Sequence, residues 1–250
     1  MLGIVGGMGP LASSAFLSTI YEQNAAAQEQ DCPVCFVYSD PTFPDRTQAI
    51  LTGEHGPVVE RLSAALHALQ AMGARKYVVA CVTAHFFLPW VKSGFHKNVI
   101  SLVDLIVDEL IKTKRPHLLL CSSGSRKAGV LEQHPRWQLA RPYVVEPNPC
   151  DQELIHRLIY SQIKTNCCNE DTIASIDLLC HRYGVAGIIA GCTELHLITR
   201  HIFKSGASGR FEILDPLLIL AKNLRRLSVE STDYSRRTRP SAAAEIGAAR

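Results

Sequence analysis

Two stretches of the sequence decide the fold: Tyr77–His85, which reads YVVACVTAH, and Val185–Leu195, which reads VAGIIAGCTEL. In each, an apolar and largely β-branched run ends in a cysteine, followed by a threonine and by a residue that can exchange protons. Such a run is typical of a buried parallel strand, and α/β proteins place their chemistry at the carboxyl ends of these strands. We therefore expect the thiols of Cys81 and Cys192 to face each other across one cleft. A pair in that arrangement takes a proton from one face of a carbon atom and returns one to the other.

Strands and helices alternate on both sides of these two stretches. The sequence predicts strands at residues 2–5, 35–38, 77–80, 118–121, 143–145, 187–190 and 211–214. It predicts helices at residues 11–28, 57–72, 102–111, 126–133, 151–164, 171–183 and 216–227. This alternation indicates an α/β fold with parallel sheets flanked by helices.

The two halves of the chain share one order of elements: strand, glycine-containing turn, helix, strand, helix, strand, cysteine. We therefore expect two similar Rossmann-like lobes, residues 1–100 and 101–210, with an active-site cleft between the carboxyl ends of their strands. Residues 211–228 are expected to pack back on the first lobe. Residues 229–250, which are rich in serine and alanine, are expected to form a flexible tail.

Composition excludes several classes of function. With 250 residues, of which 47% are apolar, the chain can bury a sizeable core. A formal net charge of +3, without a basic stripe interleaved with aromatics, argues against binding to nucleic acid. No apolar run has the length of a membrane span, and residues 1–7 read as a strand rather than a signal peptide. We expect a soluble cytoplasmic protein.

The nine cysteines do not indicate a disulfide framework, because the number is odd and no secretion signal precedes this long chain. Cys32 and Cys35 have the spacing of half a zinc site or of a redox pair. A second pair at matching spacing is missing, so neither use is favoured and no metal is expected. Five others are interpreted as buried small apolar residues or incidental surface thiols: Cys121, Cys150, Cys167, Cys168 and Cys180.

The segment Gly3–Gly9 (GIVGGMG) has the glycine content of a phosphate-cradling turn between a strand and a helix. It does not match G-x-G-x-x-G, and no acidic residue closes the second strand where a ribose contact is expected. A dinucleotide cofactor is therefore disfavoured. The alternative is that the backbone of Met8 and Gly9 approaches a small anionic substrate, with helix N-terminal amides facing its carboxylate.

Five parts of the sequence, in matching order between residue 1 and about residue 225, resemble the aspartate/glutamate racemase superfamily. They are Gly6–Pro10 (GGMGP), Tyr38–Pro41 with Pro44–Thr47, Cys81–His85, Ile159–Tyr160 with Lys164, and Gly191–Leu195 (GCTEL). The chain resembles most closely the aspartate racemase or amino-acid racemase branch, which uses cysteines and no pyridoxal phosphate. The resemblance implies cofactor-independent racemisation of an acidic amino acid, with aspartate as the first choice, by an enzyme that forms a homodimer.

The resemblance also assigns roles within the site. Racemisation removes the α-proton from one face and delivers a proton to the other, which two opposed bases can do without moving. The resemblance implies that Cys81 and Cys192 are these bases, one as thiolate and one as thiol, with roles that swap with the hand of the substrate. Arg46 and Lys164 are then expected to hold the substrate carboxylates, unless both are ordinary surface residues.

Five further polar residues are candidates for supporting roles. Thr83, Thr193 and Ser122 are expected either to donate hydrogen bonds to a substrate carboxylate or to serve in caps and turns. His85 and Glu194 are expected to orient or tune the thiols, or else to be buried polar residues with satisfied hydrogen bonds.

One residue departs from the family pattern, since Val82 stands where an asparagine usually follows the first cysteine. The loss of that amide is expected to alter substrate choice, to lower the rate or to be compensated by another donor. Two other functions remain open: a same-fold isomerase, lyase or decarboxylase in which one cysteine acts alone, and a non-catalytic protein that binds small acids. The presence of both thiols argues against the first, whereas Val82 is the feature that favours the second.

Overall fold

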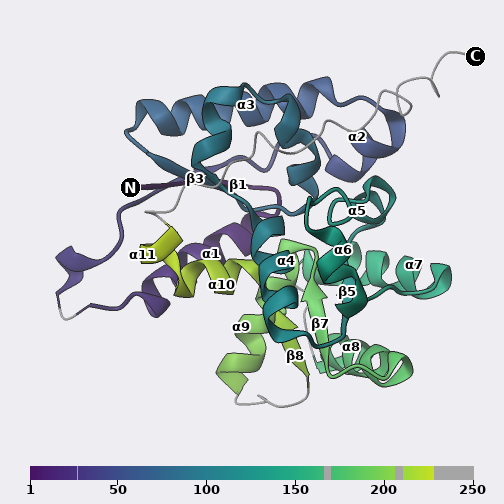
Figure 1. Ribbon diagram of the computed structural model, residues 1–250. Helices are drawn as coiled ribbons and strands as arrows, with labels where there is room; N and C mark the ends of the chain where they lie inside the picture. Colours follow the sequence, from purple (N-terminus) through teal and green to yellow (C-terminus); the bar gives the residue numbers. More distant parts are fainter. Residues whose placement is uncertain (27, 166–169, 206–210, 228–250) are drawn as a thin grey trace, which may run out of the picture.

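Two four-stranded parallel sheets form the frame of the molecule (Figure 1). The computed structural model describes residues 1–26, 28–165, 170–205 and 211–227, so Cys167, Cys168 and the predicted tail at 229–250 lie outside the described residues. The strands are β1 (Leu2–Gly6), β2 (Cys35–Ser39), β3 (Lys76–Val79) and β4 (Val99–Ile100), then β5 (His117–Leu120), β6 (Val144–Val145), β7 (Gly187–Ala190) and β8 (Glu212–Leu214). The predicted α/β fold is confirmed.

Helices surround both sheets. The α-helices are α1 (Pro10–Gln23), α2 (Arg46–Thr52), α3 (Gly56–Ala71), α4 (Leu102–Thr113), α5 (Ser123–Ala128), α6 (Trp137–Ala140), α7 (Pro149–Arg157), α8 (Glu170–Tyr183), α9 (His196–Ser205), α10 (Pro216–Lys222) and α11 (Leu224–Leu227). Short 3₁₀ turns are η1 (Glu29–Asp31), η2 (Thr83–Trp90), η3 (Ser93–Asn98), η4 (Arg141–Tyr143) and η6 (Thr193–Leu195), and η5 (Leu158–Ile163) is a π-helix. Within the described ranges, no helix combines the length and the hydropathy of a membrane span.

The two sheets have the same topology, β2-β1-β3-β4 and β6-β5-β7-β8, so the first strand of each lies between the second and the third. The registers fix the alignment, with Leu2 opposite Cys35 and Lys76 in the first sheet and Leu118 opposite Ile188 in the second. Because β3 and β7 hold equivalent places, the cysteine that follows each of them reaches the carboxyl edge of its own sheet at the same position.

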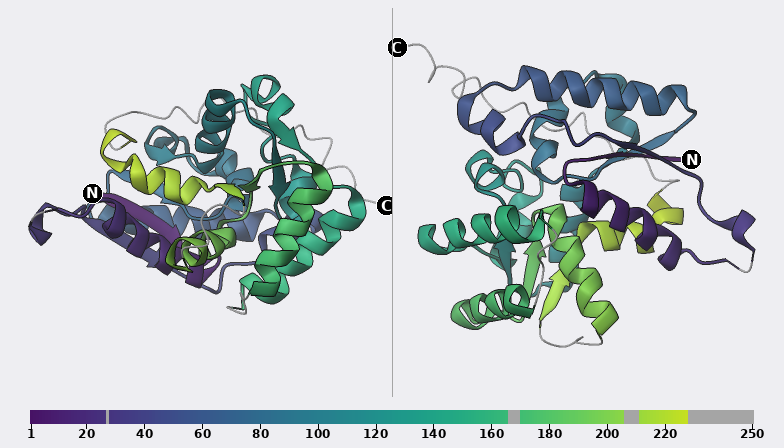
Figure 2. Two further views of the ribbon diagram at one scale, coloured as in Figure 1. Left: turned by 90° about the horizontal axis from the view of Figure 1, so that it is seen from below. Right: turned by 180° about the vertical axis from the view of Figure 1, so that it is seen from behind.

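Amphipathic helices close the two faces of the first sheet. The helix α3 places Val58, Leu62, Leu66 and Leu69 toward the sheet, a spacing of three or four residues that lines up one helical face. Figures 1 and 2 show α3 on one side of the sheet and α1 with α10 on the other. The helix α4, expected in the second lobe, buries side chains such as Ile106 in this same apolar cluster.

The closing segment, expected to return to the first lobe, is divided between the two sheets. The strand β8 pairs with β7 and so belongs to the second sheet. The helix α10 buries Leu217 and Leu220 in the apolar cluster of the first sheet, and Asn24 at the end of α1 donates a hydrogen bond to the Ala221 carbonyl at 2.8 Å. This crossing ties the second sheet to α1.

Several predicted helices have different boundaries in the structure, and the helix predicted at 216–227 is divided into α10 and α11. The helix predicted at 11–28 ends at Gln23, because the Asn24 side chain donates to the carbonyls of Ile20 and Ala221. The helix predicted at 126–133 is α5, which begins at Ser123 because the Ser122 hydroxyl accepts the Ser125 amide. The helix predicted at 151–164 passes into the π-helix η5, in which the Lys164 amide bonds to Ile159, five residues back.

Substitution of Gly124 tests the close contact between α5 and α2. A Cβ atom at Gly124 would lie 2.7 Å from the Cα of Thr47. Real Cβ atoms essentially never lie closer than 3.0 Å to such a neighbour. We expect Gly124→Ala to lower the free energy of unfolding by about 1–3 kcal/mol, because the two helices must move apart. Gly56→Ala is the matched control, since nothing lies within 4 Å of its added Cβ. Urea unfolding of both variants makes the measurement, and equal stabilities would contradict this reading.

Candidate active site

The two predicted catalytic cysteines lie in loops that contact each other. Cys81 and Cys192 each follow the third strand of their sheet by two residues, and each side chain is 4% exposed. The hydroxyl of Thr193 donates a hydrogen bond to the carbonyl of Ala80 at 3.1 Å, which joins the second loop directly to the residue before Cys81. The sequence places both thiols at sheet edges, and this bond brings the two edges together.

Cys192 is a thiol beside a buried carboxylate. Its Sγ donates to Glu194 Oε2 at 2.8 Å, and Glu194 is 2% exposed. Burial raises the pKa of Cys192 well above its ordinary value, and the Glu194 charge adds to the rise. A charge on Cys81 acts in the same direction, so the two thiols are within electrostatic reach of each other.

Lys164 is the cation on the Cys192 side. Its Nζ lies 3.8 Å from Glu194 Oε1 and 3.6 Å from the centre of the Tyr160 ring. Burial alone would lower the pKa of Lys164, but the charges of Glu194 and Cys192 outweigh it and raise the value. The side chain therefore remains protonated and opposes the negative charge next to Cys192.

Arg46 is the cation on the Cys81 side. It is 8% exposed, and its Nη1 donates to the Pro44 carbonyl at 2.9 Å while its Nη2 lies 3.5 Å from the Met8 carbonyl. Burial opposes its charge, but a thiolate at Cys81 and the carboxylate of Asp45 outweigh the effect, so the pKa of Arg46 is raised. Each cysteine thus has a cation of its own.

Two polar atoms of these charged side chains are buried without a hydrogen-bond partner among the described residues. One is Arg46 Nε, a donor, and the other is Glu194 Oε1, an acceptor whose nearest cation is at ion-pair distance. A buried polar group without a partner is costly, and such a group marks a place for a ligand or an ordered water. The site therefore offers one free donor, at the start of α2, and one free acceptor, in the Cys192 loop.

Tyr160 joins the two cation segments, a role that the sequence motif did not assign. Its hydroxyl is within hydrogen-bonding distance of Asp45 Oδ2, at 3.1 Å, and Thr47 Oγ1, at 3.0 Å, while its ring carries the ammonium of Lys164. The four-residue spacing of Tyr160 and Lys164 on one helical segment is the signal that could have identified this pair.

Thr83 and Ser122 bond to other hydroxyls in the structure. Thr83 Oγ1 lies 2.7 Å from Ser125 Oγ and 3.3 Å from Ser122 Oγ, and Thr47 donates to Ser122 at 3.4 Å. These side chains come from both sheets, so the network holds the first cysteine loop against α5 and α2. Substrate contact by Thr83 and Ser122 stays a prediction, and Ser125 and Thr47 were not found from the sequence.

His85 fixes the Cys81 loop through the backbone. The Leu102 amide donates to His85 Nε2 at 3.0 Å, so Nδ1 carries the proton and donates to the Cys81 carbonyl at 2.9 Å. Both ring nitrogens are thereby used, and the ring orients the peptide of Cys81 rather than its sulfur.

The glycine loop contacts the site at Glu194, whereas Val82 faces the core. A Cβ at Gly9 would lie 3.0 Å from Glu194 Oε1, so glycine lets the start of α1 approach this carboxylate. Met8 itself is buried and offers its carbonyl to Arg46. Val82 is 1% exposed and lines a cavity of only about 10 Å³ with apolar residues such as Leu119, so it faces the core of the protein.

Two other thiols are buried among apolar side chains, as the sequence predicts. Burial raises the pKa of Cys121 to about 12 and that of Cys180 to about 11. Cys150 is exposed, whereas Cys32 and Cys35 are partly exposed free thiols. Among the residues that the structure describes, no group of three or more His, Cys, Asp or Glu side chains is arranged to hold a metal ion.

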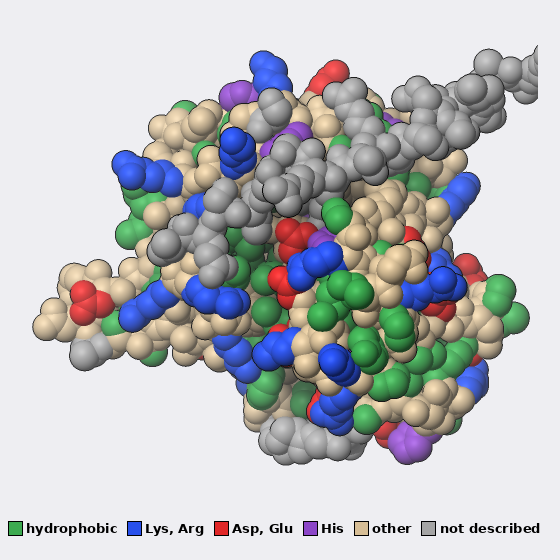
Figure 3. Space-filling view, in the orientation of Figure 1, with side chains coloured by type: hydrophobic (Ala, Val, Ile, Leu, Met, Phe, Trp, Pro, Cys, Tyr) green, Lys and Arg blue, Asp and Glu red, His purple; other side chains and the backbone are tan. Residues whose placement is uncertain are grey.

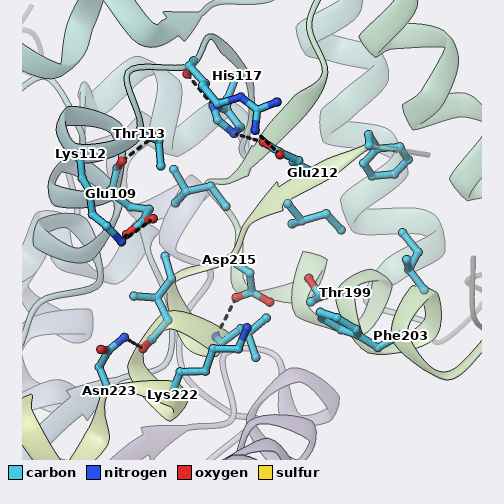
Figure 4. Close-up of a pocket in the computed structure, with 17 residues that line it drawn as sticks. Glu109, Lys112, Thr113, His117, Thr199, Phe203, Glu212, Asp215, Lys222 and Asn223 are labelled. Carbon is cyan, nitrogen blue, oxygen red and sulfur yellow. Dashed lines mark hydrogen bonds and ion pairs between the residues drawn. The ribbon is translucent and has the colours of Figure 1, made fainter. Parts of the chain in front are cut away.

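A cavity of about 510 Å³ lies away from the cysteines, between α4, β8, α9 and α10 (Figure 4). Charged side chains such as Lys112 and Glu212 line it together with apolar ones such as Phe203. Figure 3 shows Lys and Arg side chains interspersed with Asp and Glu in the middle of the face seen in Figure 1. None of the predicted site residues lines this cavity, so we assign it no part in binding the substrate.

Comparison with known proteins identifies the family of this chain. The family model of Asp/Glu/hydantoin racemases matches residues 5–224. A broad-specificity amino-acid racemase of Bacillus subtilis, RacX, is 25% identical over 240 residues, which are 89% of this chain and 96% of the relative. An aspartate racemase of Picrophilus torridus is similar in structure, with a TM-score of 0.73, 23% identity, and coverage of 94% of this chain and 97% of its own.

A second solved structure, an aspartate racemase homologue from Pyrococcus horikoshii, has a TM-score of 0.66 and 25% identity, and covers 92% of this chain and 99% of its own. The similarities extend over nearly the whole of each chain, so they concern both sheets and both cysteine loops. At the level of the family, the prediction of an amino-acid racemase is confirmed. The chain belongs to the Asp/Glu/hydantoin racemase family.

Proposed function

We propose that this protein interconverts the enantiomers of an acidic amino acid, with aspartate as the first choice, without pyridoxal phosphate and with Cys81 and Cys192 as opposed acid–base groups. The observation that carries the proposal is the matched arrangement of the two thiols. Each follows the third strand of its own sheet, each has a cation within electrostatic reach, and the Thr193–Ala80 bond joins their loops.

The unpartnered atoms of the site support an amino acid as the ligand. An α-amino acid carries a carboxylate, which needs donors, and an ammonium group, which needs acceptors. Arg46 Nε and Glu194 Oε1 are buried and offer one of each. Lys164 supplies a second cation that suits the side-chain carboxylate of a dicarboxylic substrate.

The surroundings of Cys192 support its role as the thiol. Burial and the adjacent Glu194 carboxylate disfavour a thiolate there. In the proposed cycle Cys81 enters as the thiolate base, and Arg46 is the cation coupled to it. In one direction, Cys81 takes the α-proton and Cys192 delivers its own to the opposite face, which leaves Cys192 as a thiolate opposite Lys164. Exchange of protons with solvent then restores the starting state.

Deuterium exchange at the α-carbon tests the activity directly. We expect the protein to incorporate solvent deuterium into L- and D-aspartate in heavy water and to produce the opposite enantiomer, because each thiol exchanges its proton with solvent. Glutamate and neutral amino acids, run beside aspartate, define the specificity, which the relative from Bacillus subtilis suggests is broad. Added pyridoxal phosphate is expected to change nothing. The proposal fails if no amino acid exchanges its α-proton.

Removal of either thiol is expected to abolish racemisation. Cys81→Ala and Cys192→Ala each remove one of the two groups, so a proton can leave or arrive on one face only. Cys150→Ala is the matched control, because that thiol is exposed and outside the site. Chiral chromatography of the product measures the result, and racemisation that survives both single substitutions would reject the two-thiol mechanism.

Glu194→Gln tests the effect of the carboxylate on Cys192. The negative charge of Glu194 raises the pKa of the Cys192 thiol, so its removal is expected to lower that pKa and to move alkylation of Cys192 to lower pH. Racemisation is expected to fall by about 10²-fold or more, as for the loss of a positioned acid–base partner. Mass spectrometry of iodoacetamide-treated protein across a pH series makes the measurement. An unchanged pH profile would show that Glu194 does not tune the thiol.

The homodimer implied by the resemblance stays a prediction, which sedimentation of the purified protein tests.

A further inference from the structure

We propose that His196 is a positioning residue that holds the Cys192 loop against α1. It thereby fixes the position of the Cys192 thiol when this thiol removes or delivers a proton. The inference rests on the proposed two-thiol function. It begins from a spacing: His196 follows Cys192 by four residues, as His85 follows Cys81. Both histidines are buried, and both ring nitrogens of each are within hydrogen-bonding distance of a partner.

The ring of His196 contacts two elements outside its own helix. Its Nδ1 lies 2.6 Å from Asp215 Oδ2, at the junction of β8 and α10. Its Nε2 lies 2.9 Å from Thr19 Oγ1 in α1, and its edge meets the ring of Phe16 at a centroid distance of 6.3 Å. The exposed fraction of His196 is zero. A fully buried ring that bonds at both nitrogens has one orientation, so it fixes the place of the backbone that carries it.

Asp215 gives this ring its fixed orientation. Burial alone would raise the pKa of Asp215, but His196 outweighs burial and lowers it, so the carboxylate is ionised and accepts the Nδ1 proton. The other oxygen of Asp215 accepts the amides of Leu217 and Leu218 as the N-cap of α10. Asp215 lines the cavity of Figure 4, on the side of the molecule away from the cysteines. The Asp215–His196 pair therefore holds the Cys192 loop from the side that faces this cavity.

The helix α1 serves as the common support. At the N-terminus of α1, Gly9 lies against the Glu194 carboxylate. Thr19, ten residues further along, is hydrogen-bonded to His196. Glu194 in turn accepts a hydrogen bond from the Cys192 thiol. The segment from Cys192 to His196 thus contacts α1 or its N-cap at Glu194 and at His196. Loss of the His196 bond is expected to let the segment shift while the Thr193–Ala80 bond and the Glu194 contact remain.

Such a shift acts on one thiol only, which gives a readout that general destabilisation would not produce. In a two-base site, each enantiomer loses its α-proton to a different cysteine. Deuterium that enters the recovered starting enantiomer is exchanged on one face by one cysteine, so this exchange, measured at early times for each enantiomer, reports on each thiol by itself. The enantiomer whose exchange is lost in Cys192→Ala identifies the proton that Cys192 removes.

Two substitutions remove the bond between His196 and α1 from opposite sides. In His196→Asn the side-chain amide keeps a donor for Asp215 but does not reach Thr19. In Thr19→Val the hydroxyl is lost and the shape is kept, and this variant carries the test if His196→Asn does not fold. His117→Asn is the matched control, because His117 is also buried in the second sheet but bonds the Arg115 carbonyl at the amino end of β5, away from the site.

We expect His196→Asn and Thr19→Val each to slow exchange of the Cys192-dependent enantiomer by about 10–10²-fold, since small misplacements of a reacting group cost this much. Exchange of the other enantiomer is expected to stay at the wild-type rate, as is all exchange in His117→Asn. Both substitutions remove the bond between His196 and Thr19, and Thr19→Val alone also removes the bond that Arg200 donates to Thr19. The double variant is therefore expected to be no slower than the worse single variant.

Equal losses for the two enantiomers, the same one-sided loss in His117→Asn, or additive losses in the double variant would overturn the role of His196. Partial unfolding slows the exchange of both enantiomers equally, so it counts among the equal losses. Circular dichroism measures the unfolded fraction. Wild-type protein that exchanges neither enantiomer would instead reject the proposed function, and the inference with it.

Discussion

The buried carboxylate of Glu194 is the constraint on which the site depends. A charge with 2% exposure must find partners within the protein, and this one has the Cys192 thiol at 2.8 Å and the Lys164 ammonium at 3.8 Å. These partners place Lys164 within reach of the second cysteine, which explains why a cation at the end of the π-helix η5 is partly buried. The close approach of Gly9 follows from the same charge, because a larger residue there would meet the carboxylate oxygen. The glycine loop therefore serves the acid–base pair, and no phosphate is needed to explain it.

The two thiols are alike in position and unlike in surroundings. The Cys192 thiol donates a hydrogen bond to Glu194, and the nearby cation, Lys164, lies at ion-pair distance from that same carboxylate. Arg46 is the cation coupled to Cys81, and its guanidinium is held by the Pro44 carbonyl. The two thiols therefore have different electrostatic surroundings. In the proposed mechanism the two thiols exchange roles, and Lys164 opposes the charge that a Cys192 thiolate would carry.

The sequence predicts this fold well where the signal is local. Buried parallel strands read as continuous apolar runs, so the strands that precede Cys81 and Cys192 are found to within a residue or two, and the equivalence of the two sheets follows from the order of elements. The hydroxyl network of Thr47, Thr83, Ser122 and Ser125 could not be predicted, because each bond joins residues from separate parts of the chain. The same holds for β8, which pairs with β7 while the helix after it packs against α1: a return to one lobe or the other depends on packing and not on any local pattern.

A histidine stands four residues after each of the two cysteines, and the two histidines hold their loops in different ways. His85 bonds its own loop, through the Cys81 carbonyl, and the start of α4, so it makes the first loop a closed local structure. His196 bonds Asp215 and Thr19, neither of which belongs to its loop, so the second loop is held by the packing of the two sheets against α1. His85 therefore ties Cys81 to its own loop and to α4, whereas His196 and Thr193 tie the Cys192 loop to α1 and to the loop of Cys81. The position of Cys192 thus depends on contacts with separate parts of the chain, and a change in how the two sheets pack against α1 is expected to displace Cys192 more than Cys81.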